Sequence, residues 1–295
     1  MRYFSIKQIA GIFCIMTLLI GCPKNGDTPA PPPNPPSPPT PPNPTPKTCI
    51  ISGIFQQNSG PKPEFALLIT YNSSLNPTRI SAYDSATNKQ LFIANLTYGS
   101  TDSIRIDAHQ YMKLDASKRV TAFFTKSDMT DPQGSDNYRY EYIYNTEGFL
   151  ITKNLYINGA NSPTYVTTYT YSNGLLTSCL MVVASAGNKK VLEATLTYEN
   201  GLTPKTMIYT FPDGFESYYY SSALNFGTRP NRPLKQVITT LFNPATGATI
   251  DVWTSNYSGY TINTDGYITY GVTTGEQQQG IASFFGKTTF TYQCQ

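Results

Sequence analysis

A tyrosine-rich pattern that repeats between Tyr138 and Phe211 constrains the fold of this chain more than any other feature. Each copy has an alternating run of residues, a turn that contains glycine, and a second alternating run. The copies read Tyr140-Glu-Tyr-Ile-Tyr-Asn-Thr-Glu-Gly148-Phe-Leu-Ile-Thr, Tyr169-Thr-Tyr-Ser-Asn-Gly174-Leu-Leu-Thr and Leu196-Thr-Tyr-Glu-Asn-Gly201-Leu-Thr. Gly148 and Gly174 are 26 residues apart, and Gly174 and Gly201 are 27 apart. This period predicts antiparallel hairpins that lie side by side.

The tyrosines recur with the period of a β-strand. Every second residue from Tyr138 to Tyr144 is tyrosine, so these rings share one face of the sheet. The residues between them, such as Arg139 and Glu141, are mostly polar or β-branched and point to the other face. We interpret the tyrosines as lining the covered, inner face of a curved sheet, with their hydroxyl groups bonded at its ends.

Glycine turns support the same interpretation. Asn173-Gly174 and Asn200-Gly201 supply the positive φ angles that tight hairpins need, while Glu147-Gly148 and Asp265-Gly266 suit slightly longer turns. We therefore predict an all-β fold, in which a long antiparallel meander of stacked hairpins forms a half-barrel or a barrel-like sheet. Residues 48–295 are expected to form this single domain.

Further strands are expected on both sides of the repeat, and no segment has a convincing amphipathic helical pattern. The additional strands are predicted at Phe65–Tyr71, Thr78–Tyr83, Gln90–Tyr98, Ser103–Ala108, Thr206–Phe211, Phe215–Tyr220, Gln236–Phe242, Ile250–Tyr257, Tyr260–Ile262, Tyr267–Val272 and Thr288–Tyr292. Asn225–Pro233, with its glycine and prolines, is expected to be an irregular crossing.

The first 21 residues have the features of an export signal. Arg2 and Lys7 supply positive charge, and an apolar stretch follows that is short for a membrane span. The stretch ends Leu19-Ile20-Gly21-Cys22, which resembles the lipobox of bacterial lipoproteins. The resemblance implies cleavage before Cys22 and attachment of lipid, including palmitate, to that residue. An ordinary secretory signal with a nearby cysteine is the alternative.

Residues 22–47 are expected to be a lipidated cysteine followed by a tether. The segment is dominated by proline, which fixes φ and lacks an N–H group, so it favours an extended polyproline II conformation. A spacer between lipid and domain is the favoured interpretation, and a ligand for a proline-reading domain is the alternative.

The cysteines indicate one disulfide and one buried thiol, and the charge argues against a nucleic-acid-binding protein. In an exported protein, Cys49 and Cys294 stand at the two ends of the domain and are candidates for a disulfide. Cys179 has the parity of apolar neighbours, which predicts a buried, inert thiol. Without Arg2 and Lys7 the chain has 19 basic and 18 acidic residues, so it lacks the basic footprint of a nucleic-acid-binding protein.

Two resemblances to known families follow from these motifs. The unit Tyr-x-Tyr-x-x-x-Gly-x-Leu resembles the tyrosine-aspartate repeats of Rhs-type shell proteins, although Asn145, Ser172 or Glu199 replaces the aspartate. The signal, the Pro-rich tether and the tyrosine-rich meander together resemble Bacteroidota lipoproteins of a domain-of-unknown-function family with a porin-like fold. That resemblance implies a cell-envelope protein of the outer membrane and no particular activity.

Few residues indicate catalytic or metal chemistry. His109 is the single histidine, which excludes a multi-histidine zinc site, and no Gly-x-Ser-x-Gly motif accompanies it. We therefore expect a non-catalytic protein without a cofactor. Asp128, Asp131 and Asp136 cluster in one loop and are candidates for calcium binding, against a solvated turn as the alternative.

Aromatic residues supply the leading functional hypothesis. Exposed rings stack on sugar faces while Thr, Asn and Gln bond the sugar hydroxyls, and Trp253, Tyr257 and Tyr260 are the candidate stacking residues. We expect a lipoprotein anchored by its N-terminal lipid on the periplasmic or cell-surface side of the outer membrane, with polysaccharide as its ligand. A structural lipoprotein that binds another envelope protein is the alternative.

Overall fold

The computed structural model describes residues 48–57, 64–100, 102–126, 137–209, 211–213, 216–275 and 286–295. These residues lie in one compact unit, residues 46–295. The expected signal segment, Cys22 and the Pro-rich segment lie outside the described residues, as do Asp128, Asp131 and Asp136.

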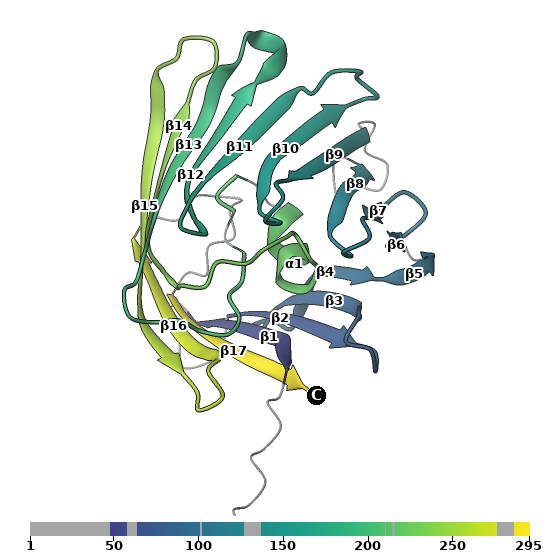
Figure 1. Ribbon diagram of the computed structural model, residues 1–295, viewed down its shortest axis with the longest axis vertical. Coiled ribbons are helices and arrows are strands. Elements are labelled where there is room, and N and C mark those ends of the chain that lie inside the picture. The colour runs from purple at the N-terminus through teal and green to yellow at the C-terminus, as the bar shows by residue number, and fades with distance from the viewer. Residues whose placement is uncertain are drawn as a thin grey trace, which may run out of the picture. The chain divides into compact units, whose positions relative to one another are not determined.

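Within these ranges, seventeen strands form one antiparallel sheet (Figure 1). The first eight are β1 (Cys49–Gln57), β2 (Phe65–Tyr71), β3 (Pro77–Asp84), β4 (Lys89–Asn95), β5 (Thr97–Ser100), β6 (Ser103–Arg105), β7 (Tyr111–Leu114) and β8 (Val120–Lys126). The others are β9 (Asn137–Tyr144), β10 (Leu150–Ile157), β11 (Tyr165–Ser172), β12 (Leu175–Val183), β13 (Lys189–Tyr198), β14 (Leu234–Phe242), β15 (Thr249–Ile262), β16 (Ile268–Gly275) and β17 (Gly286–Cys294). A short 3₁₀ turn, η1 (Ala184–Ala186), links β12 and β13.

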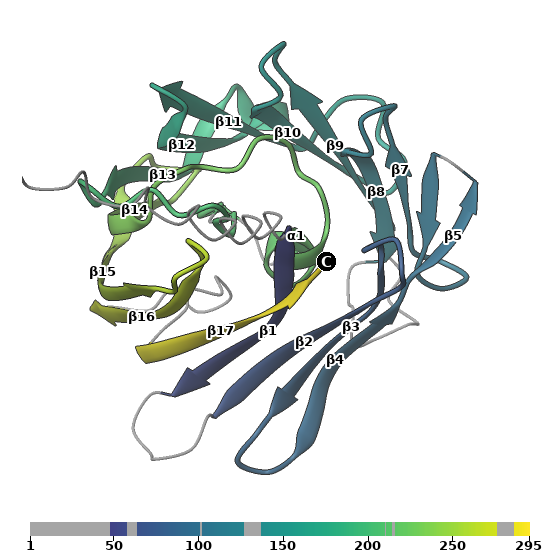
Figure 2. The same ribbon diagram turned by 60° about the horizontal axis from the view of Figure 1, so that its bottom comes forward.

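The sheet curls into a nearly closed barrel (Figure 2). Strands pair with their neighbours in the chain, and β1 pairs with both β2 and β17. β4 pairs with β3, β5 pairs with β6, and Leu96 alone separates β4 from β5. The ladder of paired strands is therefore interrupted between β4 and β5, which are connected only through the chain. We call this place the seam. The predicted all-β meander with a barrel-like sheet is confirmed.

Alternation along the strands separates a packed interior from an outer face. In β13, Leu192, Ala194 and Leu196 are at most 4% exposed, whereas Thr195 and Thr197 are exposed. Because the side chains of a strand point alternately to its two faces, the apolar set lies inside the barrel and the threonines lie outside.

Tyrosine hydroxyls fasten the open ends of the hairpins, which confirms the expected bonding at the ends of the sheet. In five strand pairs a tyrosine near the end of the second strand donates to a main-chain carbonyl near the start of the first. The bonds are Tyr71 to Ile51 (2.6 Å), Tyr144 to Val120 (2.6 Å), Tyr198 to Leu176 (2.9 Å), Tyr260 to Leu234 (2.8 Å) and Tyr292 to Ile268 (2.5 Å). The tyrosines thus have the same structural role in these five strand pairs.

The tight turn at Asn173-Gly174 is confirmed, since both residues have positive φ, 51° and 75°. Asn200-Gly201, in contrast, does not close a hairpin. β13 ends at Tyr198 and pairs with β14, which begins at Leu234. The third copy of the repeat is therefore interrupted by residues 199–233, whose ends meet through a hydrogen bond from Glu199 N to Pro233 O of 2.9 Å.

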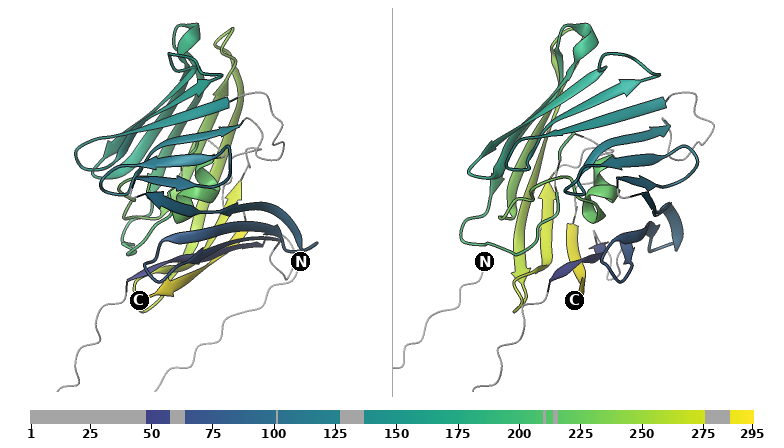
Figure 3. Two further views of the ribbon diagram at one scale, coloured as in Figure 1. Left: turned by 90° about the vertical axis from the view of Figure 1, so that its right-hand side faces the viewer. Right: turned by 45° about the vertical axis from the view of Figure 1, so that its right-hand side comes forward.

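The described part of residues 199–233, which we call the inner segment, lies inside the barrel and includes the helix α1 (Glu216–Ala223), which the strands surround (Figures 2 and 3). The strands expected at Thr206–Phe211 and Phe215–Tyr220 are therefore wrong. The wall strands already pair with one another and leave no partner inside the barrel. A helix satisfies its own backbone groups, so it suits this enclosed position.

Aromatic packing holds the inner segment against the wall. The ring of Tyr219 stacks on Phe92 of β4 with centroids 4.4 Å apart, and Tyr220, which is fully buried, meets Phe123 of β8 edge-on. Thr228 donates its backbone N–H to the carbonyl of Gly148 at 2.8 Å. These contacts place the inner segment in the same hydrophobic core as the strands.

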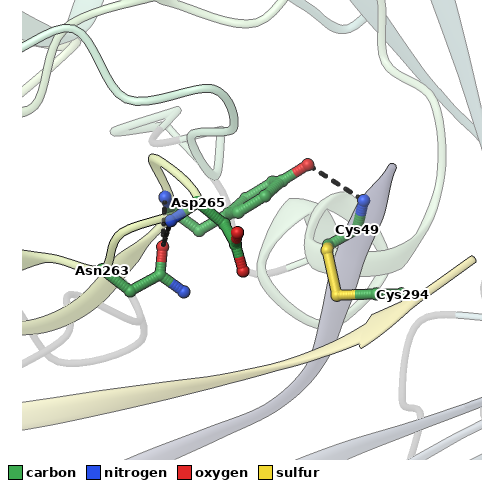
Figure 4. Close-up of a disulfide and its surroundings, with 5 residues drawn as sticks. Cys49, Asn263, Asp265 and Cys294 are labelled. Carbon is green, nitrogen blue, oxygen red and sulfur yellow. Dashed lines mark hydrogen bonds between the residues drawn. A yellow bond between two sulfur atoms is a disulfide. The ribbon is translucent and has the colours of Figure 1, made fainter. Parts of the chain in front are cut away.

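The disulfide expected between Cys49 and Cys294 is present (Figure 4). The two residues are direct partners in the ladder between β1 and β17, and Tyr267 accepts a 3.0 Å hydrogen bond from the backbone N–H of Cys49. Asn263 shapes the neighbouring turn by accepting bonds from the N–H groups of Asp265 and Tyr267. The bridge therefore joins the first strand to the last.

Within the described ranges, no helix is long and apolar enough to cross a membrane.

Candidate functional site

The three predicted stacking residues do not form an exposed aromatic platform. Tyr257 is 9% exposed, and Tyr260 is half-buried with its hydroxyl bonded to Leu234. Both line a narrow apolar cavity of about 40 Å³, which is far too small for a sugar. Trp253 is half-buried and stands opposite Thr239, a buried residue of β14. A register shift between Ser258 and Thr261 explains why Tyr260 lines the same cavity as Tyr257, although strict alternation would put residues three apart on opposite faces.

His109 is exposed and lies in the turn after β6, not on a strand. The expected strand Ser103–Ala108 ends at Arg105 because the Asp107 carboxylate accepts bonds from the backbone N–H groups of His109 (2.6 Å) and Gln110 (2.8 Å). This is an Asx turn, which competes with strand pairing. The contact between Asp107 and His109 is thus made through the His109 backbone.

Among the residues that the structure describes, no three His, Cys, Asp or Glu side chains gather as metal ligands. Cys179 is 1% exposed, as its parity predicts. Burial raises the pKa of this thiol well above its usual value, and the negative charge of Asp213 adds to the effect. The thiol is therefore held in its unreactive, protonated form.

A cavity of about 390 Å³ lies at the seam of the barrel. We call it the seam cavity. Its lining comes from the β2–β3 turn, from β5 to β8 and from the end of α1: Asn72, Leu75, Asn76, Pro77, Tyr98, Ile104, Leu114, Lys118, Val120, Ala223, Leu224 and Asn225. The volume falls within the range of about 300 to 1,000 Å³ that is usual for small-molecule pockets.

The seam cavity has an apolar floor and a polar rim. Ile104, Val120 and Leu224 are at most 5% exposed, whereas the asparagines and Lys118 at its edge are exposed. Tyr98 stands between the two zones as a half-buried ring. Burial raises the pKa of its phenol to about 12, so the hydroxyl stays protonated at neutral pH and is able both to donate and to accept a hydrogen bond.

The rim amides of the seam cavity are fixed by local bonds. Asn72 Oδ1 accepts the backbone N–H groups of Ser74 and Asn76, each at 3.0 Å, which leaves its NH₂ group as a donor. Asn225 donates to Ser117 O at 3.3 Å and accepts from Gly227 N at 2.9 Å. Oriented amides beside an aromatic ring are the groups that recognise hydroxyl-rich ligands.

A second cavity, of about 200 Å³, lies on the inner wall of the barrel between β9 and β12. We call it the inner-wall cavity. Its lining residues are Tyr140, Lys153, Leu155, Tyr165, Thr167, Met181 and Asp213. Asp213 belongs to the inner segment, so the cavity forms where that segment meets the wall.

A buried ion pair stands at the inner-wall cavity. Lys153 Nζ lies 2.8 Å from Asp213 Oδ2, and the two side chains are 5% and 0% exposed. Tyr169 donates to the same carboxylate oxygen at 2.7 Å. Charge-assisted bonds of this kind hold a buried pair together where water cannot solvate it.

Neither the seam cavity nor the inner-wall cavity was predicted from the sequence. For the inner-wall cavity a signal exists, because Lys153 has the parity of Leu155 and so places a charge on the covered face. Its partner Asp213 is 60 residues away in a segment expected to form strands, and no periodicity connects the two. The seam cavity depends on a bend at Leu96, which carries no sequence signal of its own.

Comparisons with known proteins extend the description of the fold. No protein-family model matches the chain, and no curated protein matches it in sequence. Among solved structures, the chain is similar to a porin-like protein from Bacteroides uniformis, with a TM-score of 0.54 and 17% identity over 82% of this chain and 98% of that one. It is also similar to a porin-like protein from Bacteroides vulgatus, with a TM-score of 0.53 and 10% identity over 83% and 99% of the two chains. At these identities the likeness shows the porin-like fold alone.

Proposed function

We propose that this protein is a non-catalytic lipoprotein of the cell envelope that binds a polysaccharide, and that the seam cavity receives part of the glycan. The observation that carries the proposal is the combination of a half-buried ring, Tyr98, with oriented amides at the rim of a 390 Å³ cavity. Sugars present apolar C–H faces that pack on aromatic rings, and hydroxyl groups that bond amides. The porin-like neighbours from Bacteroides support an envelope location.

The proposed sugar site lies at the seam cavity and does not include Trp253. Tyr257 and Tyr260 serve the core, so Trp253 has no exposed neighbouring ring among its predicted partners. A single half-buried indole offers less contact area than the seam cavity, which has a floor as well as a rim.

Binding is tested with the full chain in mild detergent, by calorimetry and thermal shift against a panel of polysaccharides and their oligosaccharides. A ligand that binds only the folded state raises the melting temperature. We expect Tyr98→Ala and Asn72→Ala to weaken binding of the selected glycan at least tenfold, and Trp253→Ala to leave it unchanged. Loss of binding in Trp253→Ala with full binding in Tyr98→Ala would return the site to β15.

We also propose that Cys22 carries the lipid anchor, on the basis of the lipobox-like Leu19-Ile20-Gly21-Cys22. Cells fed a clickable palmitate analogue should label the wild-type protein and not Cys22→Ser. Equal labelling of the two proteins would exclude Cys22 as the lipidated residue.

A second candidate function, binding to another envelope protein, is supported by apolar residues on the outer face of β2 and β4. Leu68, Leu91 and Ile93 are 39%, 45% and 40% exposed, and Leu68 and Ile93 flank Ser81 in one row across three strands. Exposed apolar rows on a sheet are common at protein interfaces. A photo-crosslinker at position 93 should capture one stoichiometric partner in intact cells if this function holds, whereas a sugar-binding protein needs none.

A further inference from the structure

The carboxylate of Asp213 has one oxygen that the ion pair does not use. Lys153 Nζ and the Tyr169 hydroxyl both bond Oδ2, at 2.8 and 2.7 Å. Oδ1 is buried, and no donor reaches it within the described part of the chain. A buried acceptor without a partner is unfavourable, and Asp213 is one of the residues that line the inner-wall cavity. The geometry therefore calls for a ligand that donates a hydrogen bond.

We propose that the inner-wall cavity binds a zwitterionic α-amino acid with an apolar side chain. This site is separate from the seam cavity, and the proposal does not depend on glycan binding. The ammonium group of the amino acid would donate to Asp213 Oδ1, and its carboxylate would face the Lys153 ammonium.

Charge balance selects this class of ligand. Lys153 and Asp213 carry opposite charges, so the pair is neutral as a whole although both groups are desolvated. A ligand with a net charge would leave an uncompensated charge in a buried site, which is strongly unfavourable. A zwitterion is neutral overall and offers each member of the pair a group of the opposite sign.

The remaining lining fits an apolar side chain. Leu155 and Met181 supply aliphatic surface, and Tyr140 and Tyr165 supply rings. A volume of about 200 Å³ lies below the usual range for drug-sized ligands, so it suits a molecule of amino-acid size. The printed lining has no charged residue besides Lys153 and Asp213, so a charged ligand side chain would find no counter-charge in this cavity.

The decisive experiment measures binding of leucine to the full chain by calorimetry, beside three probes of similar size. N-acetyl-leucine lacks the ammonium group, leucinamide lacks the carboxylate, and glucose replaces both charges with hydroxyl groups. We expect leucine to bind and each probe to bind at least tenfold more weakly. Glucose binding as tightly as leucine, equal binding of leucine and its two derivatives, or no binding of leucine, methionine or phenylalanine at millimolar concentration would overturn the proposal.

Two variants locate the site. Asp213→Asn should weaken leucine binding at least tenfold. Because that change also disturbs the ion pair, Leu155→Trp provides a test that leaves the pair intact and fills the cavity. Its matched control is Leu91→Trp, the same change at an outward-facing leucine that is 45% exposed. Leucine binding should disappear in Leu155→Trp and persist in Leu91→Trp, and unchanged binding in a folded Leu155→Trp would contradict the assignment.

Discussion

The hydroxyl of Tyr144, the last residue of β9, donates a 2.6 Å hydrogen bond to the main-chain carbonyl of Val120, the first residue of β8. The two strands are antiparallel partners, so this bond lies at the end of the ladder that the connecting loop does not close. Four other strand pairs have the same bond at the same place. A hairpin frays first at its open end, and a tyrosine there replaces the missing covalent connection.

We predict that Tyr144→Phe lowers the free energy of unfolding by about 1 kcal/mol, because it removes one hydrogen bond and keeps the ring. For a domain of this size the melting temperature should fall by roughly 2 to 4 °C. Tyr138→Phe, on the same strand, is the control, because the Tyr138 hydroxyl has no hydrogen-bond partner among the described residues. A melting temperature for Tyr144→Phe equal to that of the control would show that the bond contributes nothing.

The repeat shows how much of this fold was predictable. A period of two places Tyr142 inside the barrel, glycines with positive φ mark the turns at Gly148 and Gly174, and Phe65–Tyr71 is a strand with the expected bounds. Each of these features depends on residues close together in the chain. The ladder partners Cys49 and Cys294 were also predictable, because few cysteines remained to pair.

The inner segment and the two cavities were not predictable, for a physical reason. The three consecutive tyrosines Tyr218–Tyr220 have the composition of a strand, and the absence of an available strand edge inside the barrel favours a helix instead. Likewise, Lys153 and Asp213 meet because the inner segment folds back into the barrel. Such tertiary contacts override the local conformational preference of the sequence. The candidate binding sites lie where this happens.

The inner segment should be sensitive to the size of residue 227. Gly227 has φ of +99°, and a Cβ there would lie 2.3 Å from the carbonyl oxygen of Gly148. We expect Gly227→Ala to destabilise the protein by more than 3 kcal/mol, since backbone must move to relieve the contact. Gly247→Ala is the matched control. Its φ is also positive, +76°, but a Cβ would meet nothing within 4 Å, so it should cost only about 1 kcal/mol. Equal melting temperatures for the two variants would mean that the inner segment is not seated against Gly148.

The disulfide should contribute strongly to stability because it closes a loop between residues 245 apart. The chain-entropy relation gives about 5 kcal/mol as an upper figure. We expect the double variant Cys49→Ser, Cys294→Ser to unfold at markedly lower urea concentration than wild type. Cys179→Ala removes the buried free thiol and leaves the bridge intact, so it separates loss of the bridge from loss of a cysteine. A double variant as stable as Cys179→Ala would show that the ladder between β1 and β17 suffices without the bond.

Alkaline pH should unfold the protein through its buried tyrosines. Burial raises the pKa of Tyr257 to about 12, compared with about 10 in an unfolded chain. The folded state thus favours the neutral phenol, and this stabilisation is complete below pH 10 and is lost as the pH rises towards 12. The difference corresponds to about 3 kcal/mol for this one residue, and burial also raises the pKa values of Tyr144, Tyr198 and Tyr260. We expect the melting temperature to fall steeply above pH 10.

Absorbance at 295 nm should show part of the 23 tyrosines ionising near pH 10 and the rest only together with the loss of β-sheet circular dichroism. Ionisation of all tyrosines near pH 10 in a protein that keeps its β-sheet signal would contradict the structural role assigned to the repeat.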